Sequence, residues 1–224
     1  MSVQIEGEEL DYMRRIENLY FVYKSLLIES EETYNRLFTP AISGGRNALD
    51  HLMRSLQTKL GRNDKDHQYL ISNLRDAERH LYRAIYELLD VMVAWNRQTI
   101  SDAIGKYSNE TLTVICPLYF SEIKPFLLKM ITKTEAYRCG KDASSMKVEE
   151  IFAYSEEVKK LKNYVSVLEI SVPELEKYEE HSRPRLEKKI DGLQEELKSS
   201  KRLAWVFGIT TLVSAALALL AFLV

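Results

Sequence analysis

The sequence predicts an all-α protein, in which a helical bundle is followed by a charged helical stalk and one C-terminal transmembrane helix. Apolar residues recur every three or four positions through most of residues 8–172, which is the period of amphipathic helices. Glu, Lys and Arg dominate residues 174–201, and residues 203–224 carry no charge. No segment of convincing length has the two-residue period of a strand, and no repeat of about 20 to 50 residues is visible. The chain is therefore divided into four parts: a bundle (1–138), an additional bundle helix (139–172), the stalk (173–202) and a membrane anchor (203–224).

Three helices are expected before Gly105. The first covers residues 8–38 and ends before Pro40, because the residue that precedes a proline disfavours helix. A break at Ser43-Gly44-Gly45 separates it from a short second helix, which ends at the Gly61-Arg62-Asn63-Asp64 turn. The third helix is the strongest prediction, since its apolar stripe runs from residue 70 to residue 104 without Pro or Gly.

The apolar stripe of the second helix predicts which of its faces is buried. The stripe consists of Leu49, Met53, Leu56 and Leu60. At about 100° per residue, His51 lies nearly opposite this stripe and Arg46 at its edge. We therefore expect His51 to lie outside the core.

Prolines interrupt the fourth predicted helix. Ser108 or Asn109 is suited to cap its N-terminus, and its apolar residues continue to Ile131. Pro117 and Pro125 should kink the helix or split it, because a proline inside a helix removes a hydrogen bond and crowds the preceding turn.

A fifth helix over residues 148–168, ending before Pro173, precedes the stalk. Within the stalk, Pro184 marks a joint. Beyond it, apolar residues follow a four-three-four step typical of a short coiled coil. These residues are Leu186, Ile190, Leu193 and Leu197. A solvated, unpaired stalk is an equally good interpretation.

The last 22 residues, 203–224, are long enough to cross the hydrocarbon core of a bilayer as a helix. Basic residues on their N-terminal side, Lys198, Lys201 and Arg202, place the preceding domain in the cytoplasm by the positive-inside rule. We expect a single-pass, tail-anchored membrane protein; the alternative is a buried core helix or a hydrophobic hairpin. Small residues share one face of this helix and suggest a homodimer contact, although ordinary alanine-rich sequence would look the same. They are Ala204, Gly208, Thr211, Ala215 and Ala218.

Composition argues against some classes of function and neither supports nor excludes RNA as a partner. The 31 Lys and Arg nearly balance the 33 Asp and Glu, so no strongly basic field indicates a nucleic-acid partner. Cys116 and Cys139 lack metal-ligand spacing, which argues against structural zinc and for a reducing compartment. Neither a Gly-rich phosphate loop nor a serine nucleophile motif is present, and we expect no metal and no cofactor.

Three of the four histidines stand five residues after an arginine. The segments are RNALDH (Arg46 to His51), RNDKDH (Arg62 to His67) and RDAERH (Arg75 to His80). In each, a polar residue follows the arginine. This pattern resembles the R-x4-6-H motif of HEPN-domain proteins, over about residues 8–138. Here the motifs lie early, in the second and third predicted helices, which differs from the common arrangement.

The resemblance implies a four-helix bundle that dimerises and, in active members, a metal-independent endoribonuclease whose Arg and His meet their counterparts across the dimer. Many such proteins act in prokaryotic conflict systems. We predict Arg46 and His51 as the catalytic pair, with Arg75 and His80 as second choice. His67 is the poorest candidate, because its segment looks like a turn before the third helix.

The chemistry suits RNA cleavage, since a histidine moves protons near neutral pH while an arginine neutralises a phosphate. If the second and third helices are antiparallel about Asn63, the two motifs lie side by side. The alternative is that these residues are solvated surface with local ion pairs.

Two functions are therefore expected. The first is a membrane-tethered HEPN-like ribonuclease effector in prokaryotic defence or stress, which binds RNA and is a homodimer. The alternative is a non-enzymatic sensor or scaffold at the membrane, or a membrane-acting effector that oligomerises through its stalk and transmembrane helix.

Overall fold

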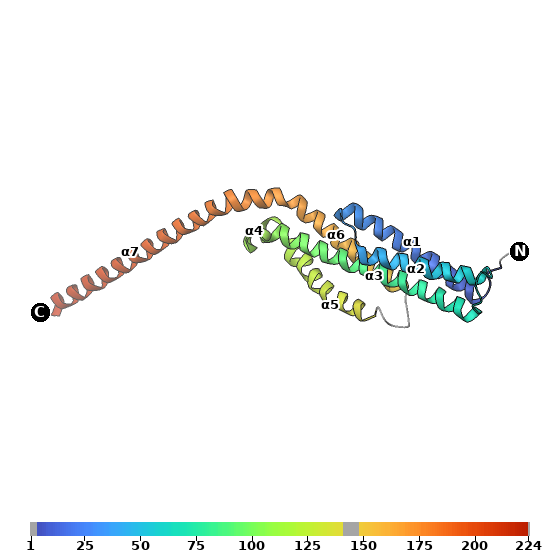
Figure 1. Ribbon diagram of the computed structural model, residues 1–224. Coiled ribbons are helices and arrows are strands. Elements are labelled where there is room, and N and C mark those ends of the chain that lie inside the picture. The colour runs from blue at the N-terminus through green and yellow to red at the C-terminus, as the bar shows by residue number, and fades with distance from the viewer. Residues whose placement is uncertain (1–3, 141–147, 224) are drawn as a thin grey trace. The chain divides into compact units, whose positions relative to one another are not determined.

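The computed structural model describes the backbone of residues 4–140 and 148–223, and the side chains of residues 4–137, 148–203 and 205. Every regular element in these residues is a helix (Figure 1), so the predicted all-α class is confirmed. The elements are α1 (Glu8–Tyr34), α2 (Thr39–Lys59), α3 (His67–Ile104), α4 (Asn109–Ile115), the π-helix η1 (Tyr119–Ile123), α5 (Lys124–Gly140), α6 (Val148–Lys177), the π-helix η2 (Tyr178–Ser182) and α7 (Arg183–Leu223). The chain forms two compact units, residues 1–106 with 117–170 and residues 107–116 with 171–224.

Helix α3 is the centre of the first unit, and α1 and α2 pack along it (Figure 1). α1 runs parallel to α3. Near its start, Arg15 Nε lies 2.6 Å from Glu78 Oε1, and at its end Asn96 Nδ2 donates to Tyr34 Oη at 2.6 Å. The helical bundle predicted for this part of the chain is therefore present.

The turn between α2 and α3 is formed as predicted. Gly61 has φ +64°, a left-handed conformation that suits glycine. Asp66 caps α3, with its Oδ1 accepting a hydrogen bond of 2.8 Å from the Tyr69 amide. Because the turn reverses the chain, α2 and α3 are antiparallel, and Ser55 Oγ donates to the Leu70 carbonyl at 3.1 Å.

The break predicted at Ser43-Gly44-Gly45 is wrong, since these residues lie inside α2. α1 ends earlier than predicted, at Tyr34, and Pro40 is the second residue of α2. The glycines serve close packing: a Cβ on Gly44 would lie 2.9 Å from Ala84 Cβ, and one on Gly45 would lie 2.5 Å from Tyr23 Oη. They let α3 and the Tyr23 side chain of α1 approach α2 more closely than a side chain at either position would allow.

The predicted buried face of α2 is also wrong. The buried residues of α2 are Ala41, Ala48 and Ser55, whereas the stripe of Leu49, Met53, Leu56 and Leu60 is 41–55% exposed. Small residues face the neighbouring helices because they permit a short distance between helix axes and many atomic contacts. The larger apolar residues are left at the surface.

Helices α5 and α6 add a buried polar layer against α3. Tyr154 Oη donates to Asp90 Oδ1 at 2.9 Å and lies 3.3 Å from Thr134 Oγ1. The rings of Tyr86 and Tyr137 pack against that of Tyr154. Burial raises the pKa of Tyr86, so its hydroxyl stays protonated.

Prolines shape the remaining helices. Pro125 and Pro184 each stand second in an α-helix that directly follows a π-helix. A proline cannot donate to the carbonyl four residues earlier, and a widened turn there relieves the clash. The predicted split of the fourth helix is confirmed; at Pro184 the chain stays helical, because η2 and α7 follow each other without a break. The predicted end before Pro173 is wrong: α6 continues to Lys177 because Leu168 and Leu175 are buried on either side of Pro173.

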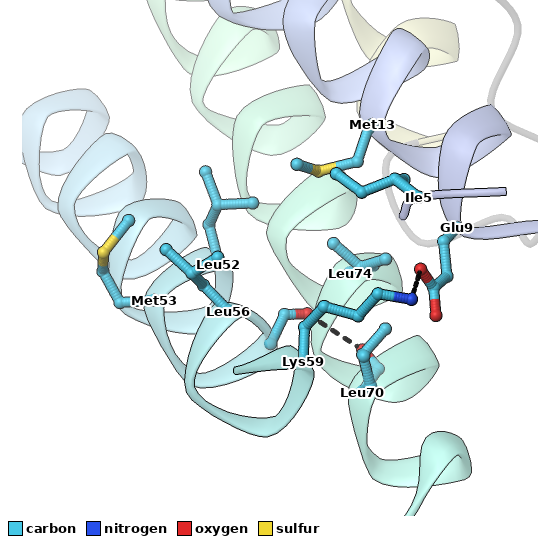
Figure 2. A pocket seen from close by; sticks show the side chains of 10 residues that line it. Ile5, Glu9, Met13, Leu52, Met53, Leu56, Lys59, Leu70 and Leu74 are labelled. Carbon is cyan, nitrogen blue, oxygen red and sulfur yellow. Dashed lines mark hydrogen bonds and ion pairs between the residues drawn. The ribbon is translucent and has the colours of Figure 1, made fainter. Parts of the chain in front are cut away.

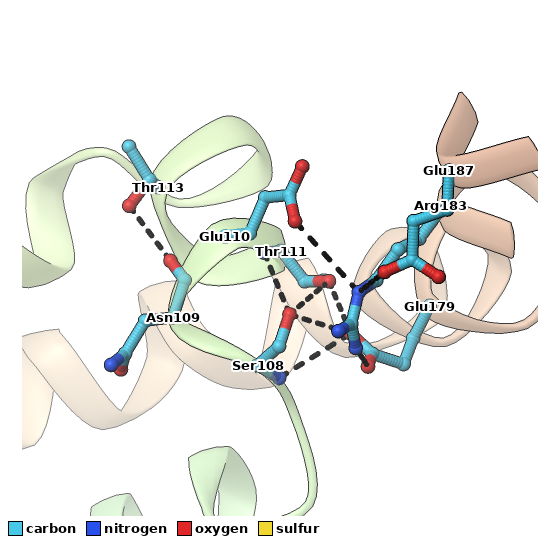
Figure 3. A network of polar contacts seen from close by, with 8 residues as sticks. All are labelled: Ser108, Asn109, Glu110, Thr111, Thr113, Glu179, Arg183 and Glu187. Atoms are coloured by element: carbon cyan, nitrogen blue, oxygen red, sulfur yellow. Dashed lines mark hydrogen bonds and ion pairs between the residues drawn. The ribbon is translucent and has the colours of Figure 1, made fainter. Parts of the chain in front are cut away.

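In the second unit, Glu179 of η2 holds the N-terminus of α4 (Figure 3). Ser108 caps α4 by accepting from the Thr111 amide at 3.1 Å. Glu179 Oε2 accepts from the Ser108 amide at 3.3 Å and from the hydroxyls of Ser108 and Thr111. The hydrogen bond from Thr111 and then that from Arg183 lower the pKa of Glu179. This carboxylate is thus ionised and ties η2 to α4.

Among the described residues, no helix combines the length and the apolar character that crossing a membrane requires. The predicted membrane helix, residues 203–224, has side chains outside the described residues, apart from Leu203 and Trp205. The same holds for its predicted dimer face of Ala204, Gly208, Thr211, Ala215 and Ala218.

Candidate functional site

The antiparallel contact between α2 and α3 brings two of the predicted histidines together. The imidazole rings of His51 and His80 stack, with centroids 5.2 Å apart and planes inclined by 21°. Both side chains are half-buried. His51 thus lies on the α3 side of α2, beside the helix interface.

A hydrogen bond fixes the tautomer of His51. Asn73, which is buried, donates through Nδ2 to the Tyr69 carbonyl at 2.9 Å, so its Oδ1 is an acceptor. His51 Nδ1 lies 2.9 Å from this Oδ1 and must carry a hydrogen. In the neutral ring, His51 Nε2 is therefore the free acceptor, and in the charged ring it is a second donor.

The second histidine has a different environment. Burial and then the neighbouring His51 lower the pKa of His80, while Asp76 opposes this shift. Arg83 and Arg79 lower the pKa of His80 further. Since two stacked imidazolium ions repel each other, the pair holds one proton more readily than two.

The predicted arginines do not join this pair. Arg75 Nε donates to Tyr12 Oη on α1 at 3.2 Å. Arg46 is exposed, and five residues along a helix turn it about 140° away from His51. The structure therefore unites the histidines of two motifs, and it does not unite the arginine and histidine of either one.

His67 of the third motif lies elsewhere, at the start of α3. Its Nδ1 is 3.3 Å from Glu9 Oε1, and Lys59 Nζ is 2.5 Å from Glu9 Oε2. His67 is thus next to Glu9 and is not part of the stacked pair.

A longer repeat, which the R-x4-H pattern covers only in part, surrounds the two stacked histidines. Residues 46–54 read RNALDHLMR and residues 75–83 read RDAERHLYR. Both fit R-[ND]-A-x-x-H-L-x-R, so the shared pattern extends to Arg54 and Arg83. The alanines at its third position, Ala48 and Ala77, are both buried. The repeat could have been found by comparing the residues that follow each histidine.

The opposite edge of α2 carries an apolar groove of about 120 Å³ between α1, α2 and α3 (Figure 2). The ion pair of Lys59 and Glu9 forms one wall. The apolar lining consists of Ile5, Met13, Leu52, Met53, Leu56, Leu70 and Leu74. Such a lining suits apolar side chains of a partner better than a charged substrate.

Comparison of this chain with models of known protein families, with curated proteins and with solved structures finds no match.

Proposed function

We propose that this chain is a membrane-tethered, HEPN-like ribonuclease effector that needs no metal and uses His51 and His80 as its acid–base pair. The observation that carries this proposal is the stacking of two histidines from a repeated segment. The resemblance to HEPN domains supports RNA as substrate and defence or stress as the setting.

The pair can perform both proton transfers of RNA cleavage. His80, whose pKa is lowered, takes the proton of the 2'-hydroxyl, and the 2'-oxygen attacks phosphorus. The bond to the 5'-oxygen breaks, and protonated His51 gives its Nε2 proton to that oxygen. The products are a 2',3'-cyclic phosphate and a 5'-hydroxyl, and the pair ends with its proton exchanged between rings.

The test uses the purified full chain in detergent with single-stranded RNA and EDTA. Wild type should give cyclic phosphate ends with a bell-shaped pH profile. His51→Ala and His80→Ala should each lose about 100-fold or more in rate, and His67→Ala should cleave as wild type does. The proposal is refuted if the wild type does not cleave RNA or if His51→Ala cleaves it as fast as the wild type does.

Both histidines come from one chain, so this site is complete without a partner. Mixing His51→Ala with His80→Ala protein should therefore restore no cleavage. Restored activity would instead assign the two histidines to different protomers.

We also propose that residues 203–224 anchor the chain in a membrane and that α7 pairs in parallel with a second copy. Support comes from the exposure of Leu186, Ile190, Leu193 and Leu197, each 44–56% exposed. Cysteine placed at Leu186 or at Leu197 should form disulfide-linked dimers in native membranes, and at Gly192 it should not. An antiparallel pair would link neither position efficiently.

A second candidate is a non-enzymatic scaffold at the membrane, which the apolar groove favours. Leu56→Ser lies in the groove and away from the histidines. The second test asks whether expression of the wild type arrests growth. If it does, and Leu56→Ser or truncation after Lys198 abolishes the arrest while His51→Ala and His80→Ala do not, the scaffold is correct and the nuclease is not.

A further inference from the structure

We infer that Arg54 and Arg83 form a two-armed clamp for the phosphates on either side of the scissile one. This inference deepens the proposed ribonuclease and rests on it for the identity of the ligand, a single-stranded RNA backbone. Arg54 and Arg83 thus take the phosphate-binding role that the motif resemblance would give to Arg46 and Arg75.

Helix geometry places each arginine beside its histidine. Arg54 follows His51 by three residues, and Arg83 follows His80 by three, a spacing that puts side chains on one helix face. The electrostatic effect of Arg83 on His80 agrees with this placement. Each histidine thus has one arginine one turn further along its own helix.

The antiparallel arrangement then separates the two arginines along the interface. With His51 stacked on His80, Arg54 lies towards the C-terminal end of α2 and Arg83 towards that of α3. Each is displaced by three residues of 1.5 Å rise, so they stand about 9 Å apart along the helix axes. Such a spacing brackets a phosphate at the histidines and reaches the phosphates before and after it.

Both guanidinium groups are accessible and oriented. The side chain of Arg54 is 50% exposed and lies 2.6 Å from Asp50; that of Arg83 is 66% exposed and lies 3.0 Å from Glu87. Each acidic partner is four residues away on the same helix and restricts its arginine while leaving donors for a phosphate. Exposed pairs of this kind are weak, so a phosphate competes with them easily.

The repeat supplies a separate argument. An arginine three residues after the histidine occurs in both copies of R-[ND]-A-x-x-H-L-x-R, whereas the positions written x differ. In the two copies, Met53 corresponds to Tyr82 and Asp50 to Arg79.

The test measures binding without cleavage. The full chain carrying His51→Ala is titrated with a single-stranded RNA oligonucleotide at salt concentrations from about 50 to about 200 mM. Over this range the affinity depends strongly on salt because contacts to phosphates release counterions. Arg54→Gln and Arg83→Gln should each weaken binding about fivefold and reduce the salt slope by about 0.7, and the double variant by about 1.4. Arg79→Gln is the matched control, because Arg79 is 63% exposed, pairs with Asp76 and lies next to His80; it should keep the full slope.

The outcomes separate the clamp from the nuclease. Equal slopes for Arg54→Gln, Arg83→Gln and Arg79→Gln overturn the clamp, even if wild type cleaves RNA. RNA bound through both arginines by a wild type that does not cleave it upholds the clamp and refutes the nuclease.

Discussion

Helices α2 and α7 carry apolar residues at the same spacing and yet meet their surroundings differently. The stripe of α2 is 41–55% exposed and that of α7 is 44–56% exposed. α2 is nevertheless fixed in the bundle through Gly44, Ala48 and Ser55, while residues 184–203 of α7 have no buried side chain. The small residues, and not the large apolar ones, decide which face of α2 is covered.

The strongest test of this difference fills the closest contact. Gly44→Val should destabilise the first unit by about 3 kcal/mol, because its Cβ would meet Ala84 at 2.9 Å and the buried helices would have to separate. Gly192→Val on α7 is the control: nothing lies within 4 Å of its added Cβ, so stability should change by no more than about 0.5 kcal/mol. Urea unfolding followed by circular dichroism measures both, and equal effects would refute the close-packing argument.

A serine in each helix gives a smaller contrast. Ser55→Ala should cost about 1 kcal/mol, since it removes a buried hydrogen bond to the Leu70 carbonyl. Ser199 also donates to a backbone carbonyl, that of Glu196, but is exposed. Ser199→Ala should therefore be neutral or slightly stabilising in the same unfolding experiment. A loss of stability as large as that of Ser55→Ala would contradict the comparison.

The histidines extend the comparison to pH. The pKa of His80 is lowered from 6.5 in the folded chain, so the unfolded chain binds this proton more readily. The stability that neutral His80 contributes is fully present above about pH 6.5 and is lost as the pH falls through the lowered value. His80→Gln should flatten the decline in melting temperature between about pH 7.5 and 5.5. His181→Gln, at an exposed histidine of η2, should leave that decline unchanged.

Substitutions in the apolar stripes of α2 and α7 should have the smallest effects on the free energy of unfolding. Leu49 and Leu193 are 55% and 56% exposed, so Leu49→Ser and Leu193→Ser should each alter unfolding by about 0.5 kcal/mol or less. Only Leu193→Ser should reduce self-association, measured by analytical ultracentrifugation in detergent. A reduction by Leu49→Ser alone would move the dimer contact from α7 to α2.

The caps, the turn and the long third helix were predictable because their causes are local. Asp66 and Ser108 are good cap residues, and Gly61 can adopt a positive φ wherever it stands. The prediction for α2 was wrong because two adjacent glycines, Gly44 and Gly45, usually indicate a break between helices when only the local sequence is considered. Their reason is the approach of Ala84 and Tyr23, which are distant in sequence.

The candidate site was predictable in part for the same reason. That the histidine motifs of α2 and α3 would lie near each other followed from the turn at Gly61. The direction of each arginine did not, because Arg75 is drawn to Tyr12 of α1, a contact without a local pattern. Arg54 and Arg83 could have been predicted from the sequence, because HLMR and HLYR share an arginine three residues after the histidine.

The two copies of the nine-residue segment are joined covalently, and this permits a division of labour. In a site built from two identical chains, each histidine has the same neighbours and must serve in either role. Here only His51 is supported by Asn73, and only His80 has Asp76 one turn before it, where His51 has Asn47. Substitutions can therefore accumulate in one copy of the segment without occurring in the other. A single gene can in this way encode two histidines with different properties.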